Sequence, residues 1–388
     1  MPTTNFRNLL YRAALPLSPS PRGQMSHITH GHPIDIKAFQ HILCKHHVLG
    51  SSLLLCQGDD FAAVHTSISH PAHHADSDTL FRVASITKMA TALVTLKLAE
   101  EGAFALDDPI APLLPDAAGE SALQGITIRK LLCHTSGLRD VPAYEQALRN
   151  GDTFHTVLRS EGVRVDNNAM SYCNFGFGLL GCLMESVTGQ SLETVFQQKL
   201  FQPLGIEATL DASTLEESRI MPIARVLPYR QGQDITITSL GRKSIAQPDP
   251  ARHFGHTAGA MYTNCASLSN LMLIIANNGT YKGKQYFSPD LIRQMKTQHG
   301  YTGAAAAPDR RYGLGLVILD RPDISPRKLY GHQGFAYGCV DGAFIEEETG
   351  RQVIFLNGGC SEAREGRLGL SNKALLQWAL QKELPAWK

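Results

Sequence analysis

The sequence predicts an α+β fold: an antiparallel β-sheet flanked by helices, with a mainly helical domain inserted between the two parts of the chain that build the sheet. Residues 51–56 and 61–69 are short β-type runs on either side of a polar turn, which indicates a hairpin. Strand patterns return near the C-terminus at 312–319, 338–345 and 351–357. Because strands gather at both ends of the chain, both ends are expected to form one sheet.

Helical patterns fill most of the stretch from Ser85 to about residue 300. Ser85 opens the longest of them, whose apolar residues recur mostly three and four positions apart until Gly102 ends it. Thr127 and Ser191 can cap two shorter helices through their hydroxyl groups. Further helices are expected at 175–188, at 265–277 and at 374–380.

The chain is expected to divide into a leader and one folded unit. Residues 1–24, rich in Ser, Pro and Arg, are predicted to be a poorly ordered leader. Residues 25–388 form the catalytic unit, with a sheet subdomain from 35–84 and 300–388 and a helical subdomain at about 85–300.

Composition excludes several classes of partner. The 388 residues are 43% hydrophobic and carry a formal charge of +1, so neither nucleic acid nor an anionic membrane is expected to bind. No stretch approaches the roughly 18 apolar residues that span a bilayer. Arg12 interrupts the apolar run that a secretory signal needs, so no signal peptide is predicted. The expected partner is a small-molecule or short-peptide substrate, and the oligomeric state stays open.

The cysteines and the histidines can each be interpreted in two ways, as a disulfide framework or metal site, or as ordinary structural residues. The eight cysteines include no CxxC pair, and in a chain of this length they are expected to be small buried side chains rather than a disulfide framework. A cytoplasmic location is therefore predicted. Ten of the 16 histidines lie between His27 and His74, which could suggest a metal site. We favour solvated loop histidines and predict no metal, because no Cys or carboxylate lies at matching ligand spacing.

Ser85 and Lys88 form the first candidate catalytic pair. Residues three apart on a helix share a face, and a neutral lysine can take the proton of a serine hydroxyl. Burial lowers the pKa of such a lysine, and the helix N-terminus favours developing negative charge. The same S-x-x-K pattern recurs at Ser325 and Lys328, but only Ser85 opens a long helix.

Tyr172 and Asn174 form the second candidate element, immediately before the helix at 175–188. A phenol with a lowered pKa could share a proton with Lys88 and protonate a leaving group. The amide of Asn174 could hold a substrate carbonyl and fix Lys88. A similar run contains Tyr262 and Asn264, where we expect a helix cap instead.

The third candidate element runs from Gly331 to Phe335 and is expected to open onto a strand. A sheet edge beside the nucleophile can supply one backbone N–H of an oxyanion hole, and Gly334 permits a close approach of substrate. His332 adds a hydrogen-bonding group. The run that begins at His253 has a similar form, which makes this motif the least specific of the three.

In this order, and together with the runs 131–138 (LLCHTSGL) and 258–261 (AGAM), the three motifs resemble those of the class C β-lactamase and D-Ala-D-Ala carboxypeptidase family of penicillin-recognising serine hydrolases. The likeness covers about residues 35 to 385 and implies a β-lactamase/transpeptidase-like fold. It implies Ser85 as the acylated nucleophile, Lys88 and Tyr172 as the base pair, and Asn174 as a substrate contact. It also implies an oxyanion hole formed by the backbone N–H groups of Ser85 and Phe335.

One position departs from the β-lactamases that this family contains. They usually carry Lys-Thr-Gly where this chain has His332-Gln333-Gly334. A histidine there is similar to the peptidase branch, whereas many esterases of the family carry tryptophan. The missing cation and threonine hydroxyl, which engage a substrate carboxylate, argue against efficient β-lactam hydrolysis. No acidic residue is identified as a deacylation base, so Tyr172 is expected to serve.

The sequence therefore predicts acyl transfer to water through a Ser85 acyl-enzyme on a small amide or ester, without a cofactor. A D-Ala-D-Ala carboxypeptidase, a D-aminopeptidase or a β-lactamase would each fit, and a peptide ending in a D-residue is the first expectation. A carboxylesterase of the same fold and a penicillin-binding sensor that acylates without turnover are the alternatives. His134, Ser136 and Gly137 are expected to form a structural turn, and Cys173 is not expected to be a nucleophile.

Overall fold

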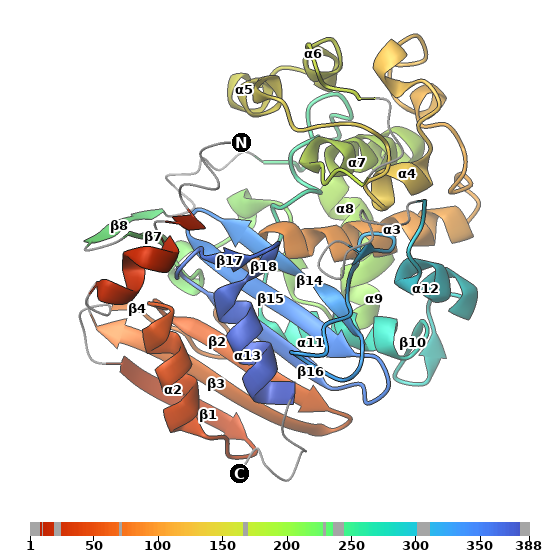
Figure 1. Cartoon of the computed structure of the whole chain (residues 1–388). Coiled ribbons are helices and arrows are strands. Elements are labelled where there is room, and N and C mark those ends of the chain that lie inside the picture. Colours follow the sequence, from red (N-terminus) through yellow and green to blue (C-terminus); the bar gives the residue numbers. More distant parts are fainter. Residues whose placement is uncertain are drawn as a thin grey trace.

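The computed structural model describes residues 8–9, 11–18, 25–69, 72–165, 170–227, 230–235, 244–300 and 311–380. Both ends of the chain build one antiparallel sheet, and most helices of the middle of the chain form a second lobe beside it (Figure 1). The predicted α+β architecture is therefore confirmed.

The large sheet has the strand order β1-β3-β2-β16-β15-β14-β13-β12, with β4 paired to β3. In chain order its strands are β1 (Met25–Gly31), β2 (Ser51–Gln57), β3 (Asp60–Ser69), β4 (Ala72–His73), β12 (Arg311–Tyr312), β13 (Val317–Leu319), β14 (Leu329–Ala336), β15 (Cys339–Glu346) and β16 (Gln352–Asn357). Strand β2 from the N-terminal hairpin pairs with β16 from the C-terminal part, so Ser51 lies opposite Asn357. The hairpin and the two last predicted strands are confirmed, whereas the run 312–319 is divided between β12 and β13.

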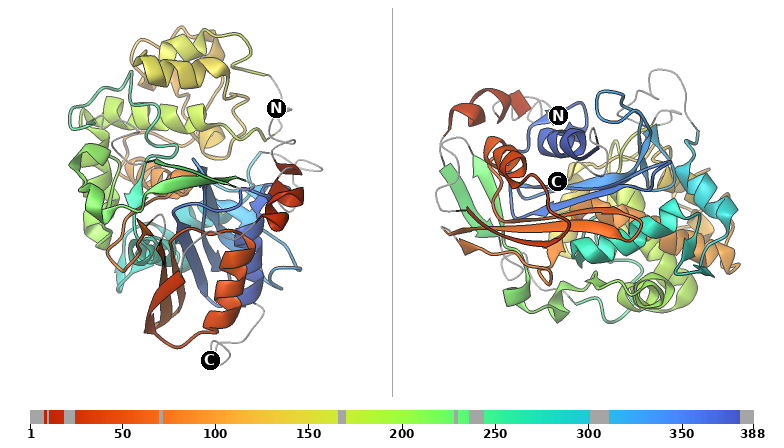
Figure 2. Two further views of the ribbon diagram at one scale, coloured as in Figure 1. Left: turned by 90° about the vertical axis from the view of Figure 1, so that its left-hand side faces the viewer. Right: turned by 90° about the horizontal axis from the view of Figure 1, so that it is seen from below.

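Alternating side chains of the sheet enter two different cores. Leu53 and Leu55 of β2 pack with α2 (Ile36–Lys45) and α13 (Leu370–Leu380). Leu54 points the opposite way, into the core shared with α3 (Thr87–Glu100) and α11 (Cys265–Ala276). The view from below in Figure 2 shows the sheet between these two helical layers. Since both faces are covered, the central strands are apolar on both sides.

The helical lobe is formed mainly around α3 and α7. Its helices include α4 (Ile128–Leu132), α5 (Pro142–Asn150), α6 (Phe154–Leu158), α7 (Asn174–Thr188), α8 (Leu192–Phe196) and α9 (Gln202–Leu204), with a π-helical turn at Gln197–Phe201, and α12 (Pro289–Lys296) follows later in the chain. Thr127 and Ser191 cap α4 and α8 by accepting the N–H groups of Lys130 and Thr194, as predicted.

Short strands complete the fold at the borders of the lobes. They are β5 (Phe81–Arg82), β6 (Ala208–Thr209) and β9 (Tyr262–Thr263) in one small sheet, and the hairpins β7–β8 (Ile223–Leu227 and Arg230–Ile235), β10–β11 (Thr280–Tyr281 and Lys284–Gln285) and β17–β18 (Arg364–Glu365 and Leu368–Gly369). Strand β9 lies between β5 and β6, so it joins the segment before Ser85 to the middle of the chain.

Part of the predicted leader packs against the folded unit. Residues 8–9 and 11–13 are helical, a 3-10 turn follows at Leu15–Leu17, and Tyr11 and Leu15 are each only 2% exposed. The expectation of a poorly ordered segment is thus wrong for these residues. The prediction rested on the polar composition of the whole segment, whereas two of its apolar side chains, Tyr11 and Leu15, pack into a core. Residues 1–7, 10 and 19–24 lie outside the described residues.

All eight cysteines are free thiols, and seven of them are buried. This agrees with their predicted role as small buried side chains. The histidine interpretation was partly wrong, because His46, His47, His65 and His73 are buried rather than solvated. Within the described part of the chain, no three His, Cys, Asp or Glu side chains are grouped as metal ligands would be, and no helix is long and apolar enough to cross a membrane.

Candidate active site

Ser85 lies in a strained turn between the two lobes. It belongs to the 3-10 turn Ala84–Ile86, which continues directly into α3, so the predicted helix begins two residues later than expected. Ala84 has a φ of +46°, a left-handed conformation that costs a non-glycine residue about 1–2 kcal/mol. Strand β14 packs against this turn at Gly334, where a Cβ atom would lie 2.3 Å from the carbonyl oxygen of Val83. Gly334 is therefore required for the strand to approach the turn.

Lys88 reaches the hydroxyl of Ser85 from one helical turn away, as its spacing predicts. Its Nζ lies 3.1 Å from Ser85 Oγ, 2.8 Å from Asn174 Oδ1 and 2.6 Å from the carbonyl oxygen of Ala258. The lysine is fully buried, and the rings of Tyr172 and Phe177 lie 4.9 and 5.5 Å from Nζ. Three oxygen atoms thus fix the amine beside the serine.

Desolvation sets the protonation states of Lys88, which is fully buried, and of Tyr172, which is partly buried. Desolvation lowers the pKa of Lys88 to about 7, although the carboxylate of Asp140 opposes this shift. Tyr172 donates a hydrogen bond of 2.7 Å to Ser85 Oγ, but burial and the neighbouring Tyr312 raise its pKa well above the usual 10. The expectation of a phenol with a lowered pKa is wrong in direction. Tyr172 holds its proton, and Lys88 is the group that can be neutral near pH 7.

Asn174 is oriented by a carboxylate that the motif analysis missed. Asp140 accepts the backbone N–H groups of Asn174 and Phe175 at 2.8 and 2.9 Å and the side-chain amide of Asn174 at 2.8 Å. It therefore satisfies the first N–H groups of α7 and turns Asn174 Oδ1 toward Lys88. Asp140 follows the run 131–138 in the sequence, but it lies 34 positions before Asn174, and this separation along the chain concealed the contact.

The predicted turn around His134 is confirmed, and it also supports the tyrosine. His134 has a φ of +59°, is 1% exposed, and accepts the N–H of Cys173 on Nδ1 at 3.2 Å. Its ring lies 4.4 Å from that of Tyr172. Desolvation holds the pKa of His134 well below 6.5, so the ring that packs against Tyr172 is uncharged.

The run Gly331–Phe335 lies inside strand β14 rather than before a strand. At the far end of the β14–β15 hairpin, the N–H of Glu347 bonds to the carbonyl of Lys328. Because bonded and non-bonded pairs alternate in an antiparallel ladder, this pair directs the N–H of Phe335 away from β15. The N–H of Phe335 therefore lies on the β13 side of β14, but past the last residue that pairs with β13. The Ser85 turn packs against this end of β14, which is where an oxyanion donor is expected.

His332 lies beneath the surface of the site, 2% exposed, with its ring 6.3 Å from that of Tyr172. Its Nδ1 lies 2.7 Å from the carbonyl oxygen of Gln333, which places the ring proton on Nδ1 and leaves Nε2 as an acceptor. Burial, together with the charge of Lys88, lowers the pKa of His332 to about 3. It supplies no cation, in contrast to a lysine at this position.

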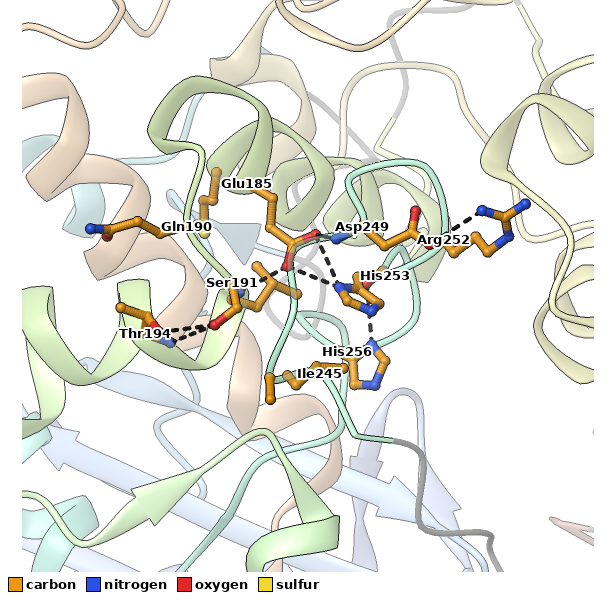
Figure 3. A network of polar contacts seen from close by, with 12 residues as sticks. Glu185, Gln190, Ser191, Thr194, Ile245, Asp249, Arg252, His253 and His256 are labelled. Carbon is orange, nitrogen blue, oxygen red and sulfur yellow. Dashed lines mark hydrogen bonds and ion pairs between the residues drawn. The ribbon is translucent and has the colours of Figure 1, made fainter.

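The carbonyl of Ala258 belongs to a loop that α7 anchors from its C-terminal end. Glu185 is a buried carboxylate that accepts the N–H groups of Leu192 and Asp249 and lies 2.9 Å from Nδ1 of His253 (Figure 3). Four residues further on, Thr257 donates to the carbonyl of Phe177. Helix α7 therefore contacts Lys88 directly through Asn174 and indirectly through this loop.

The competing motifs have structural explanations. Ser325 donates to the buried carboxylate of Glu346, and Asn264 caps α11 by accepting the N–H of Ser267. His253 pairs with Glu185. Ser85, Lys88, Tyr172 and Asn174 are thus brought together, with His332, Gly334 and Phe335 on the adjoining strand.

Comparison with known proteins identifies the family of the chain and proteins that share its fold. The family described as Beta-lactamase matches residues 36–356. The chain is 28% identical to Penicillin-binding protein 4 of Amycolatopsis lactamdurans over 44% of this chain and 47% of that protein, so the match spans about half of that relative. It is 26% identical to Esterase EstB of Burkholderia gladioli, over 76% of this chain and 81% of the esterase. The D-amino acid amidase of Ochrobactrum anthropi SV3 shares the fold, with a TM-score of 0.67 and 22% identity over 89% of this chain and 98% of the amidase.

Proposed function

Because the chain belongs to the Beta-lactamase family, we propose that it is a serine hydrolase that forms an acyl-enzyme on Ser85. One observation carries the proposal: Ser85 Oγ lies within hydrogen-bond distance of both Lys88 Nζ and the hydroxyl of Tyr172. A nucleophile that touches a base and an acid at once has the groups that acyl transfer needs.

In the acylation step, neutral Lys88 takes the proton of Ser85 as Oγ attacks the substrate carbonyl carbon. The negative charge that forms on the carbonyl oxygen is stabilised by the backbone N–H groups of Ser85 and Phe335. When the bond to the leaving nitrogen or oxygen breaks, Tyr172 supplies a proton and regains one from the Lys88 ammonium. The high pKa of Tyr172 supports this assignment, because a tyrosine that keeps its proton is available as an acid.

Deacylation repeats these roles with water as the nucleophile. Asp140, the carboxylate nearest to the motif residues, is engaged by Asn174 and by the start of α7. It is therefore assigned to positioning, and Lys88 and Tyr172 activate the water.

For the substrate we propose a small amide or ester, with a short peptide or amide containing a D-residue first. Neutral, buried His332 supports this choice, because it cannot supply the cation that holds a β-lactam carboxylate at this strand position. The amidase with the same fold agrees with it. A carboxylesterase is the second candidate, favoured by the esterase that matches this chain over 76% of its length.

Time-resolved intact-protein mass spectrometry tests the proposal. Wild type and Ser85→Ala are each mixed with a reactive acyl ester, with D-amino-acid amides, and with benzylpenicillin. We expect wild type to gain the acyl mass and then lose it, and Ser85→Ala to gain none. Lys88→Arg is the matched control, because it keeps a positive charge but cannot act as a base.

The outcomes separate the candidates. Faster turnover of amides than of matched esters supports the peptidase or amidase, and the reverse supports the esterase. An adduct that forms on Ser85 and never clears identifies an acylated sensor. Equal labelling of wild type and Ser85→Ala would contradict the proposal.

A further inference from the structure

We propose that residues 8–9 and 11–18 form a strap that positions the substrate-side wall of the Ser85 site, so that Asn8 and Tyr11 are positioning residues for acylation. This inference rests on the proposed function, because it concerns the same site. The wall consists of the β17–β18 hairpin, residues 364–369, which lies beside β14.

The strap is fastened to the base of this hairpin by its own small core. Tyr11 and Leu15 pack in one cluster with Ala363, the residue before the hairpin, and Leu370, the residue after it, also contacts that cluster. The N–H of Leu370 bonds to the carbonyl of Ala363 and closes the hairpin. The strap therefore packs against the base of the hairpin, where its two ends meet.

Polar contacts fix the register of the strap. Asn8 accepts the N–H of Arg364 on Oδ1 at 2.8 Å and donates from Nδ2 to the carbonyl of the same residue at 3.3 Å. One side chain thus imitates a neighbouring strand for the first residue of β17. The hydroxyl of Tyr11 lies 2.8 Å from the carbonyl oxygen of Val226 and 3.1 Å from a carboxylate oxygen of Glu362.

The other side of the hairpin contacts the strand that borders the nucleophile. The side chain of Gln333 donates to the carbonyl of Arg367 at 2.6 Å and accepts the N–H of Gly369 at 3.1 Å. The guanidinium of Arg364 stacks 3.7 Å from the ring centre of Phe335. These contacts flank Gly334, so a displaced hairpin would displace the strand segment that offers the oxyanion N–H.

The hairpin also reaches the tyrosine of the site. The guanidinium of Arg367 lies 5.6 Å from the ring centre of Tyr172. Contacts therefore run from Asn8 through Arg364 to Phe335, while Ser85, Lys88 and the hydroxyl of Tyr172 are held by other elements. Loosening the strap should therefore misplace the oxyanion donor and slow acylation, while the nucleophile and its base keep their positions.

Steady-state kinetics with a soluble acyl ester test this inference on the full chain. Asn8→Ala removes both contacts with Arg364, and Tyr11→Phe removes only the hydroxyl contacts. We expect each change to lower kcat/KM, which reports acylation, by about 3- to 10-fold, the equivalent of one or two hydrogen bonds, and to leave the pH dependence of acylation unchanged. Leu9→Ala is the matched control, because Leu9 is 64% exposed in the same segment and its replacement should leave kcat/KM unchanged.

A role in stability alone would give a different result. It would lower the melting temperature or the fraction of protein that the ester labels, with kcat/KM unchanged in the folded fraction, and that outcome overturns the inference. An equal fall of kcat/KM in Leu9→Ala would also overturn it. If wild type is not labelled on Ser85, the proposed function itself fails, which the labelling experiment shows independently of the strap variants.

Discussion

Lys88 is the residue whose environment most directly predicts a measurable property. Its pKa is lowered to about 7, whereas burial keeps the pKa of His332 near 3 and raises that of Tyr172 well above 10. Between pH 5 and 9 the lysine is thus expected to be the group that titrates beside Ser85. Since only neutral Lys88 can accept the serine proton, acylation should fall about tenfold for each pH unit below 7 and level off above 8.

The measurement is the single-turnover acylation rate against pH, read by mass or by release of a chromophoric leaving group. Lys88→Arg should show no such profile, because its guanidinium stays protonated. A rate independent of pH from 5 to 9 would contradict the assignment of Lys88 as base.

Individual catalytic candidates could be predicted from the sequence when they lie close together along the chain. Ser85 and Lys88 are one helical turn apart, and Tyr172 and Asn174 precede an evident helix, so local patterns locate them. Asp140 and the carbonyl of Ala258 escaped prediction for a physical reason. Their contacts with Asn174 and Lys88 join residues 34 and 170 positions apart, and a backbone carbonyl leaves no mark on the residue type.

At the scale of elements, the loop 249–261 should control Lys88 through its anchor on α7. Replacing Glu185 by Gln turns one oxygen into an NH₂ group that faces the N–H of Leu192 or Asp249. Such a buried mismatch costs about 1–3 kcal/mol, so the melting temperature should fall by several degrees. As the loop loosens, Ala258 should hold the ammonium form of Lys88 less well. The pKa of Lys88 would then fall further, and the acid limb of the acylation profile would move to lower pH.

Glu193→Gln is the matched control for this change. Glu193 also accepts two backbone N–H groups, those of Leu210 and Asp211, but it does not contact the loop that carries Ala258. It should lower the melting temperature and leave the acid limb in place. If both variants shift the limb equally, or if neither does, the loop does not position Lys88.

Elements were predicted best where one pattern governed the whole segment. The capped helices and the β2–β3 hairpin have clear local signals, and both were found. Strand β14 was not predicted as a strand, because its sequence LYGHQGFA contains two glycines and polar residues. Those glycines are required by contacts: a Cβ at Gly331 would lie 2.0 Å from the carbonyl oxygen of Ala343, and Gly334 lies against the Ser85 turn.

The molecule as a whole follows from the distribution of strands along the chain. Strands near both termini and helices between them left one sheet with an inserted helical part as the simplest arrangement. The placement of residues 8–9 and 11–18 could not be predicted in this way. Their docking depends on a cluster of buried side chains that includes Leu49, Val226 and Ala363, which are far apart in sequence and meet only in the folded chain.

Thiol reactivity offers a test of the folded molecule as a whole. Seven of the eight cysteines are buried, and desolvation raises the pKa of each of them, while Cys44 on α2 is exposed. The reactive form of a thiol is the thiolate, so burial and a raised pKa both slow its reaction. Native protein should therefore react rapidly at one thiol with an aromatic disulfide reagent at pH 8, and at eight after denaturation.

Cys44→Ser should abolish the rapid phase and leave seven thiols in the denatured chain. The slow phase then reports global opening, because the buried cysteines lie in both lobes, from Cys182 on α7 to Cys339 on β15. Wild type modified at Cys44 by the disulfide reagent should still be acylated at the normal rate, since Cys173 beside Asn174 stays buried and unmodified. Rapid reaction of two or more thiols in the native protein would show that the lobes open locally, and loss of acylation on labelling would assign Cys173 a role that its burial argues against.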